Sequence, residues 1–419
     1  MKVLVVGASG LIGSHVMQAL CDAGCQVTGM SRRRPQGARD WLAADVASLT
    51  DARDWLPLLR QADAVVNCVG IIRERRAGDF DRLHRAAPAA LFAACEQLGV
   101  RRVVQVSALG SDAAASTGYW RSKGAADADL LARAVQACVV RPSLVYGDDG
   151  ASSIMFRALA TLPVLALPMA RRARVQPIHV RDLAALIATL VTAEQAPPRE
   201  LAAVGPRPLT LAAYLDELRR GMRAAPALVL ELPAPLARIA ARVAAWWPAS
   251  ALTPESLRML ERSADGGNTA DPGAAAALLG HPPQDPARFA QPAQRIAAVW
   301  HWAAPMITLA MAALWLWTAA VSWFGWPHAQ SHAWLAACGV PAPAREVTLL
   351  AASLADALIG ALLLLRPRRW LWAAQLALVG GYTLAMSACL PGFWLHPFGP
   401  LSKNLPLLAL MLWMWRGSR

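Results

Sequence analysis

Hydrophobic and polar positions follow two different patterns along the chain. Up to about residue 204, short apolar runs alternate with stretches in which apolar residues recur every three or four positions. The run Lys2–Val6 has no polar face, as expected of a central parallel strand that is buried on both sides. Beyond residue 300, charges almost vanish and apolar segments of about twenty residues follow one another. The first pattern predicts a doubly wound α/β domain and the second predicts membrane helices.

The first thirteen residues combine a strand, a glycine turn and a helix. The apolar run ends at Gly7, and Gly10 and Gly13 follow at intervals of three, around the helical pattern that begins at Leu11. Side chains at the three glycines would block a tight turn, hold a pyrophosphate off the backbone and push the helix from the strand. Free N–H groups at the start of the helix would then bind the pyrophosphate. We therefore expect a Rossmann-type dinucleotide site rather than a signal peptide, since glycines interrupt the run.

The end of the second predicted strand, residues 26–30, indicates which dinucleotide binds. A domain that prefers NAD usually carries an acidic residue there, which accepts a hydrogen bond from the ribose 2′-OH. This chain has Ser31-Arg32-Arg33-Arg34 and no acid. Because a guanidinium suits a 2′-phosphate, the sequence favours NADP(H), with Arg32 as a contact. A solvated loop with mixed cofactor use is the alternative.

A tyrosine and a lysine lie four residues apart after the strand predicted at 102–106. Tyr119 and Lys123 share one helical face, although the chain holds only four tyrosines and three lysines. A phenol with an ordinary pKa of about 10 becomes a phenolate near neutral pH only beside a cation. We expect Lys123 to lower the pKa of Tyr119, and Ser107 to hold the substrate oxygen. A surface pair without a role is the alternative.

These pieces together resemble the short-chain dehydrogenase/reductase family, in its extended and atypical branches. The resemblance covers residues 1 to about 290 and includes Asn67-Cys68-Val69-Gly70, Arg141-Pro142-Ser143 and Ile178-His179-Val180-Arg181-Asp182-Leu183. It implies that Asp45 lies near the adenine, that Lys123 reaches the nicotinamide ribose, and that Tyr119 moves a proton beside Ser107. The expected cofactor contacts are Gly7, Ser9, Gly10, Leu11, Ile12, Gly13, Arg32, Asp45, Val46, Asn67 and Lys123.

The chain also resembles the branch that contains a nucleotide-binding accessory subunit of respiratory complex I, in which the tyrosine and lysine are often missing. Their presence here favours activity. Residues 71–80 contain Arg73, Glu74, Arg75 and Arg76, for which no substrate motif can be assigned. The sequence therefore leaves the substrate open.

Two features of residues 151–295, the predicted substrate-binding part and linker, have more than one interpretation. We expect His179 to fix a strand rather than to act as a second acid or base. The stretch 235–247 has Leu236, Ile239, Val243 and Trp246 on one side. A helix of the substrate-binding part is favoured there over a helix on the membrane surface.

Composition separates the two parts of the chain further. Of its 419 residues, 56% are hydrophobic, and the formal net charge of +13 comes almost wholly from arginine. No zinc spacing, basic helix or aromatic-basic sheet motif points to nucleic acid, so an anionic membrane surface is the favoured partner. The seven cysteines are scattered without metal-binding or redox spacing, which fits a reducing cytosol around the N-terminal part.

Residues 296–419 predict a four-helix transmembrane domain, with apolar segments at 302–324, 347–365, 370–390 and 401–415. The first three segments are long enough to cross about 30 Å of hydrocarbon, whereas the fourth is shorter and contains Lys403. Twelve of the 17 tryptophans fall in this quarter, as expected near membrane interfaces. Arginines precede the first segment, separate the second from the third and follow the fourth. The positive-inside rule then predicts a multi-pass inner-membrane protein with both termini in the cytoplasm.

This quarter resembles the DoxX-like four-helix membrane family, through Ala355-Asp356-Ala357-Leu358-Ile359-Gly360 and the stretch from His396 to Pro406. Asp356 falls in the middle of a span, where a carboxylate usually has a partner and a purpose. We expect Asp356, His396 and Lys403 to line one polar pocket. A hydrogen bond from Asp356 that holds the bundle together is the alternative.

The sequence thus predicts a membrane-tethered, NAD(P)-dependent oxidoreductase or epimerase without a metal. Its expected substrate is a lipid-like carbonyl or alcohol, for example an isoprenoid or a quinone-related compound. A non-catalytic nucleotide-bound module that supports a membrane redox partner is the second hypothesis. A third hypothesis makes the C-terminal bundle the working part. The direction of the reaction and the oligomeric state stay open.

Overall fold

The computed structural model describes residues 1–38, 40–244 and 253–418. The chain divides into two compact units, Met1–Val299 and Trp300–Arg419. Two residues of the sequence predictions lie outside the described ranges. They are Trp246, expected on one side of a helix, and Arg419, in the last arginine cluster.

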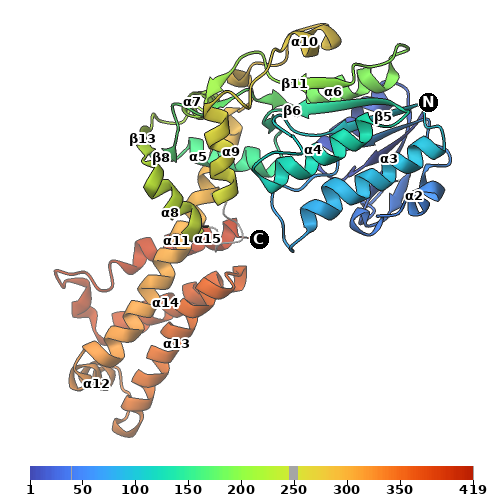
Figure 1. The fold of residues 1–419 in the computed structure, drawn as a ribbon. Helices are drawn as coiled ribbons and strands as arrows, with labels where there is room; N and C mark the ends of the chain where they lie inside the picture. The colour runs from blue at the N-terminus through green and yellow to red at the C-terminus, as the bar shows by residue number, and fades with distance from the viewer. Residues whose placement is uncertain (39, 245–252, 419) are drawn as a thin grey trace. The chain divides into compact units, whose positions relative to one another are not determined.

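A seven-stranded parallel sheet forms the centre of the first unit (Figure 1). The strand order is β11-β6-β5-β4-β1-β2-β3, so β1 lies between β2 and β4. Ligands of such sheets bind at the carboxyl edge, beside the point where the strand order reverses. The strands are β1 (Lys2–Val6), β2 (Gln26–Ser31), β3 (Trp41–Ala43), β4 (Ala64–Asn67), β5 (Arg102–Val106), β6 (Gln136–Pro142) and β11 (Glu200–Ala203).

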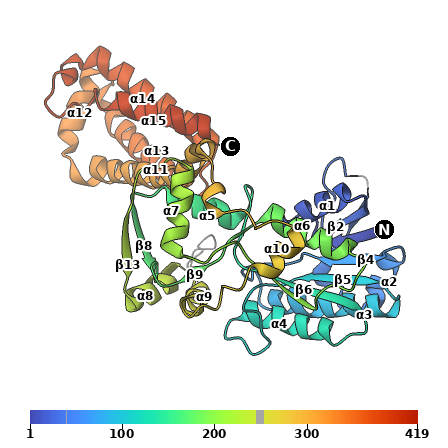
Figure 2. The ribbon, with the colours of Figure 1, turned by 90° about the horizontal axis from the view of Figure 1, so that it is seen from above.

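Helices cover both faces of this sheet, as Figure 2 shows. One face packs against α1 (Leu11–Asp22), α6 (Val180–Thr192) and α10 (Gly273–Leu279). The other packs against α2 (Ala52–Leu59), α3 (Ala87–Gln97) and α4 (Gly118–Leu131). Residues 3–6 of β1 are at most 2% exposed, because apolar cores lie on both sides of the strand. The doubly wound α/β class predicted from the sequence is therefore confirmed.

Short sheets and helices make up the rest of the first unit. The strand pairs are β7 (Val145–Tyr146) with β10 (Ile178–His179), β8 (Val164–Pro168) with β13 (Leu228–Leu232), and β9 (Arg174–Val175) with β12 (Leu209–Thr210). The helices are α5 (Ala151–Ala160), α7 (Leu211–Gly221), α8 (Ala234–Ala244) and α9 (Pro254–Ala264). His179 ends β10, and its Nδ1 accepts a hydrogen bond from the backbone N–H of Arg181. It therefore caps α6 while its strand pairs with β7.

The second unit is helical, and α11 (Arg295–Ala320) enters it from the first unit. Its other helices are α12 (His328–Ala337), α13 (Arg345–Leu365), α14 (Arg369–Cys389) and α15 (Asn404–Gly417). Among the described residues, three helices are long and apolar enough to cross a membrane, at Pro292–Gly325, Ala342–Leu365 and Arg369–Cys389. The fourth predicted span corresponds to α15, whose 14 residues extend only about 21 Å at 1.5 Å per residue.

Candidate functional site

Gly7, Gly10 and Gly13 form the turn between β1 and α1. Gly7 has a φ of +80°, a conformation that side chains rarely adopt. A Cβ on Gly13 would lie 2.3 Å from the carbonyl oxygen of Gly7, so only glycine lets α1 pack this closely. A Cβ on Gly10 would meet that same oxygen at 3.3 Å and no other heavy atom within 4 Å. The turn thus has the close packing and the open side that a dinucleotide needs.

The residues around this turn lie at the carboxyl edge of the sheet. Ser9 is exposed, and Leu11 and Ile12 begin α1 half-buried. Arg32 follows β2 directly and is exposed, so its guanidinium is open to a ligand at this edge. These positions fit a bound nucleotide at the start of α1.

Asp45, Val46 and Asn67 have partners within the protein. The Asp45 carboxylate accepts a hydrogen bond from the N–H of Ala47 at 3.2 Å, and Val46 is buried in the core. The Asn67 amide donates to Gln105 at 2.8 Å and accepts from the N–H of Val69 at 3.1 Å. These bonds fix the loops after β3 and β4. Direct contact of the three residues with a cofactor remains a prediction.

Tyr119 and Lys123 lie on one face of α4, which Thr117 caps. The Nζ of Lys123 lies 6.0 Å from the centre of the Tyr119 ring. It donates a hydrogen bond to the carbonyl oxygen of Val106, the last residue of β5, at 3.0 Å. A Cβ on Gly70, after β4, would lie 3.4 Å from the same Nζ. The pair is therefore held at the carboxyl ends of β4 and β5, the edge to which the glycine turn of β1 also belongs.

Burial controls the ionisation of this pair. It raises the pKa of Tyr119 to about 12, and the charge of Asp127 adds to the rise. Burial also lowers the pKa of Lys123 to about 8, against the opposing effects of Asp127 and Cys68. The expected lowering of the Tyr119 pKa is thus not found, because loss of solvation outweighs an ammonium 6.0 Å from the ring. At neutral pH the phenol is protonated and can donate a proton.

Ser107 contacts a carboxylate that the sequence analysis missed. Its hydroxyl donates to Asp127 at 2.6 Å, and Asp127 is 1% exposed. Arg141 lies 3.5 Å from the same carboxylate oxygen. Burial raises the pKa of Asp127, whereas Ser107, Arg141 and Lys123 act against the rise. The spacing of Tyr119, Lys123 and Asp127, four and eight residues along one helix, was the available signal.

His84 is a second residue that the sequence analysis did not identify. It lies in a π-helical turn, Asp81–Ala86, and its ring is 5.6 Å from the Tyr119 ring, edge to face. Its Nε2 accepts a hydrogen bond from the N–H of Ile71 at 3.0 Å, and its Nδ1 lies 3.0 Å from the hydroxyl of Ser122. Burial, then Lys123, lowers the pKa of His84 to about 3. The neutral ring therefore carries its hydrogen on Nδ1 and supports the backbone beside Tyr119.

A hollow lies next to Tyr119, at the start of α4. The Glu255 carboxylate, from α9, accepts a hydrogen bond from the N–H of Tyr119 at 3.0 Å. Glu255 and Arg73 both line a pocket of about 400 Å³ together with Phe80, whose ring contacts Tyr119 edge to face. Residues of the segment 71–80 therefore lie close to the proposed proton donor.

In the second unit, the three predicted polar residues are not hydrogen-bonded to one another. Asp356 is 7% exposed, and its Oδ1 has no hydrogen-bond partner among the described residues. His396 accepts from the N–H of Phe398, and Lys403 is exposed. Other side chains link the helices: Trp315 donates to Gln375, and Asn404 donates to Thr383, both at 2.8 Å. A shared pocket for Asp356, His396 and Lys403 remains a prediction.

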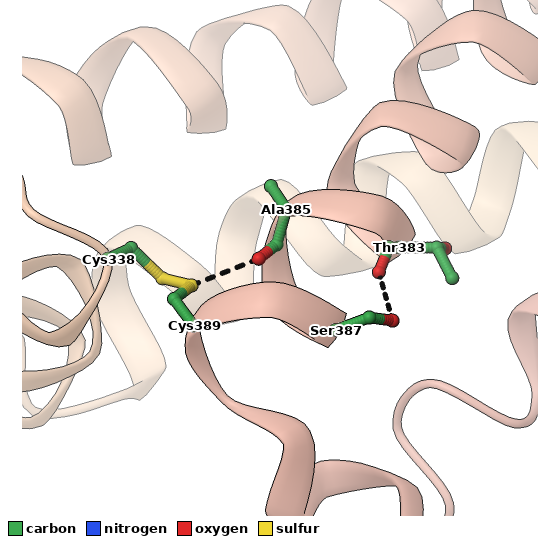
Figure 3. Close-up of a disulfide and its surroundings, with 5 residues drawn as sticks. All are labelled: Cys338, Thr383, Ala385, Ser387 and Cys389. Carbon is green, nitrogen blue, oxygen red and sulfur yellow. Dashed lines mark hydrogen bonds between the residues drawn. A yellow bond between two sulfur atoms is a disulfide. The ribbon is translucent and has the colours of Figure 1, made fainter.

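A disulfide joins Cys338, after α12, to Cys389, at the end of α14 (Figure 3). The two residues are 51 positions apart, and no spacing in the sequence indicated the bond. Cys338 precedes α13 and Cys389 ends α14, whereas Arg366–Arg369 connects the opposite ends of these two helices. The disulfide and the arginine cluster therefore lie at opposite ends of the bundle. Among the described residues, no group of three or more His, Cys, Asp or Glu is arranged to hold a metal ion.

The parallel sheet and the glycine turn define a Rossmann-type nucleotide-binding domain. Residues 3–205 match the NAD dependent epimerase/dehydratase family, and residues 312–412 match the DoxX-like family. The chain thus joins an NAD-binding domain of the short-chain dehydrogenase/reductase type to a DoxX-like membrane domain.

Two relatives match the first part of the chain. A ceramide reductase of Caulobacter vibrioides is 29% identical over 188 residues, which are 44% of this chain and 58% of the relative. The NADH dehydrogenase (ubiquinone) 1 alpha subcomplex subunit 9 of Arabidopsis thaliana is 28% identical over 196 residues, 44% of this chain and 48% of that protein. The chain therefore spans about half the length of these curated relatives.

Solved structures share the fold of the first part. A nucleoside-diphosphate-sugar epimerase of Staphylococcus aureus has a TM-score of 0.55 and 17% identity over 69% of this chain and 99% of its own. A short-chain dehydrogenase/reductase superfamily protein of Agrobacterium tumefaciens with bound NAD has a TM-score of 0.53 and 15% identity over 73% of this chain and 99% of its own. At these identities the likeness concerns the fold alone.

Proposed function

We propose that this protein is a membrane-tethered, NADP(H)-dependent reductase of a lipid-like carbonyl compound. The observation that carries the proposal is the position of Tyr119 and Lys123, at the ends of β4 and β5 beside the glycine turn. Two ionisable side chains with shifted pKa values, 6.0 Å apart at this edge, are more than nucleotide binding requires. The match to a ceramide reductase supports a lipid-like substrate.

The proposed chemistry divides between the cofactor and the side chains. A bound nicotinamide supplies the hydride to the carbonyl carbon. Tyr119, protonated at neutral pH because burial raises its pKa to about 12, donates a proton to the substrate oxygen. Lys123, held by the carbonyl of Val106, supplies positive charge beside the phenol as the proton leaves.

Replacement of Tyr119 tests the catalytic role. The exchange Tyr119→Phe should lower turnover about 10²- to 10⁴-fold and leave NADPH binding intact. Tyr214→Phe is the control, because Tyr214 is a buried tyrosine in a different core. The measurement is cofactor oxidation by the full chain in membranes, with long-chain keto-lipids as substrates. Equal turnover in the wild type and the Tyr119 variant would refute the assignment.

The preference for NADP(H) rests on Arg32. The exchange Arg32→Ala should raise the Kd of NADPH about tenfold to a hundredfold and change that of NADH little, because only NADPH has a 2′-phosphate. Arg60→Ala is the control at an exposed arginine directly after α2. Equal losses for both cofactors would favour mixed cofactor use.

We also propose that the first unit and both termini face the cytoplasm of an inner-membrane protein. The arginines between α13 and α14 favour the cytoplasmic side at that end of the bundle. The disulfide at the other end fits an oxidising compartment. The two signals are independent and agree.

The second candidate is a non-catalytic subunit of a membrane redox assembly, favoured by the similarity to complex I subunit 9. The two proposals differ in a measurable way. Co-purification with respiratory subunits, without any turnover that depends on Tyr119, would favour the second.

A further inference from the structure

Helix α8 has its apolar side turned away from the core of the first unit. Its small residues Ala237 and Ala241 are fully buried, against Leu257 of α9. Its large aliphatic residues Leu236, Ile239 and Val243 are 54%, 57% and 66% exposed. Their spacing of three and four places them on one helical face. A helix that only packs in a soluble domain shows the opposite arrangement.

The strand pair before α8 shows the same inversion. Strand β13 pairs in parallel with β8, with Leu228 opposite Val164. Leu228 and Leu230 are 60% and 47% exposed, and Val164 is 46% exposed, whereas Leu165 is buried. Because alternate residues of a strand point to opposite faces, these three share the outer face. We call this face and the exposed side of α8 the aliphatic surface.

Arginines accompany the aliphatic surface. Arg238 and Arg242 lie on α8 itself and are exposed, and Arg238 is 3.7 Å from Glu261. Arg172 lines a pocket with Pro233, at the start of α8, where Glu231, Glu261 and Asp265 also lie. Aliphatic side chains with arginines beside them match a bilayer whose headgroups carry negative charge.

The same chain also carries helices that are able to span a membrane. The first helix able to span a membrane begins at Pro292, 49 positions after Val243 in the numbering of the sequence. We infer that the aliphatic surface docks into the cytoplasmic leaflet of the membrane in which the protein is anchored, with its arginines on anionic headgroups. If the proposed function holds, the docking also implies a route for the substrate. A lipid substrate passes from that leaflet to the first unit without crossing water.

Quenching by brominated lipids tests the docking. Ile239→Cys and Val243→Cys, in a chain with Cys21→Ser and Cys25→Ser, are each labelled with an environment-sensitive fluorophore. The full chain is placed, one copy per disc, in nanodiscs of phosphatidylcholine and phosphatidylglycerol with bromines on the acyl chains. Arg60→Cys, at an exposed position directly after α2, is the matched control. We expect quenching several-fold stronger at positions 239 and 243 than at position 60.

Three results would overturn the inference. Quenching equal to that at position 60 would place the surface in water. Resistance to both brominated lipid and aqueous iodide would mean that the helical bundle of the same chain covers it. Protection that appears only with two copies per disc would indicate a dimer contact. Replacement of phosphatidylglycerol by phosphatidylcholine, and Arg238→Gln with Arg242→Gln, should each weaken the lipid quenching.

Entry of the substrate from the leaflet is tested by a separate measurement. Leu236→Asn with Ile239→Asn should lower turnover of a long-chain keto-lipid in the bilayer and leave that of a short-chain, water-soluble analogue unchanged. Equal turnover of the long-chain substrate would refute entry from the leaflet. If neither substrate is turned over by the unmodified protein, the proposed function fails, while lipid quenching still decides the docking.

Discussion

Ser107 donates a hydrogen bond of 2.6 Å to Asp127, and both side chains are buried. Asp127 lies one helical turn beyond Lys123, so the serine acts on the surroundings of the lysine. A buried carboxylate that loses its donor retains the cost of lost solvation. The bond therefore predicts an effect on stability as well as on activity.

The exchange Ser107→Ala should lower the free energy of unfolding of the first unit by about 1–3 kcal/mol. Thermal unfolding of the full chain, followed by a probe in the first unit, measures this loss. Ser111→Ala is the matched control, since the Ser111 hydroxyl is buried and has no hydrogen-bond partner among the described residues. Unchanged stability with a large loss of turnover would instead indicate that Ser107 holds the substrate.

The loss of kcat/KM at alkaline pH should reflect the deprotonation of Lys123. Its pKa of about 8 means that the ammonium is charged below this pH and neutral above it. We therefore expect kcat/KM for reduction to fall as pH rises through about 8, because the positive charge beside Tyr119 is lost. In Lys123→Arg the fall should move to higher pH, since a guanidinium stays charged. Lys2→Arg is the control, and an unmoved profile in Lys123→Arg would assign the titration to another group.

Substitutions at two glycines of the turn should have different effects, one on cofactor binding and the other on folding. Gly10→Ala should raise the Kd of NADPH at least tenfold, about 1.4 kcal/mol, with little change in thermal stability. Stability should change little because a Cβ added at Gly10 would meet only one protein atom, at 3.3 Å. Gly13→Ala should unfold the first unit, because its Cβ would lie 2.3 Å from the Gly7 oxygen. Isothermal titration and thermal unfolding measure the two effects, and unimpaired NADPH binding in Gly10→Ala would exclude the turn as the pyrophosphate site.

The position of the disulfide predicts which end of the helical bundle faces away from the cytoplasm. After mild reduction of intact cells, a membrane-impermeant maleimide should label Cys338 and Cys389. The exposed thiol of Cys21 in the first unit should react only after the membrane is opened, and serves as the internal control. Labelling of Cys21 in intact cells would reverse the proposed orientation.

Much of the architecture follows from local patterns. The apolar run of β1 has no polar face because the strand is buried on both sides, and the turn after it needs glycine for local steric reasons. Both were therefore predictable. The same holds for three membrane helices, since length and hydropathy alone decide whether a helix crosses a bilayer. The tyrosine and lysine were found because helical spacing puts them on one face.

Contacts between distant segments needed the tertiary structure. Ser107 meets Asp127 across 20 positions and Cys338 meets Cys389 across 51, and no periodicity encodes such pairs. The raised pKa of Tyr119 depends on burial, which the fold sets. The outward face of α8 was also hidden, because an amphipathic sequence shows that a helix has two sides but not which side the core takes. Sequence determined the elements and their chemistry, whereas packing decided which groups lose water and which partner each one meets.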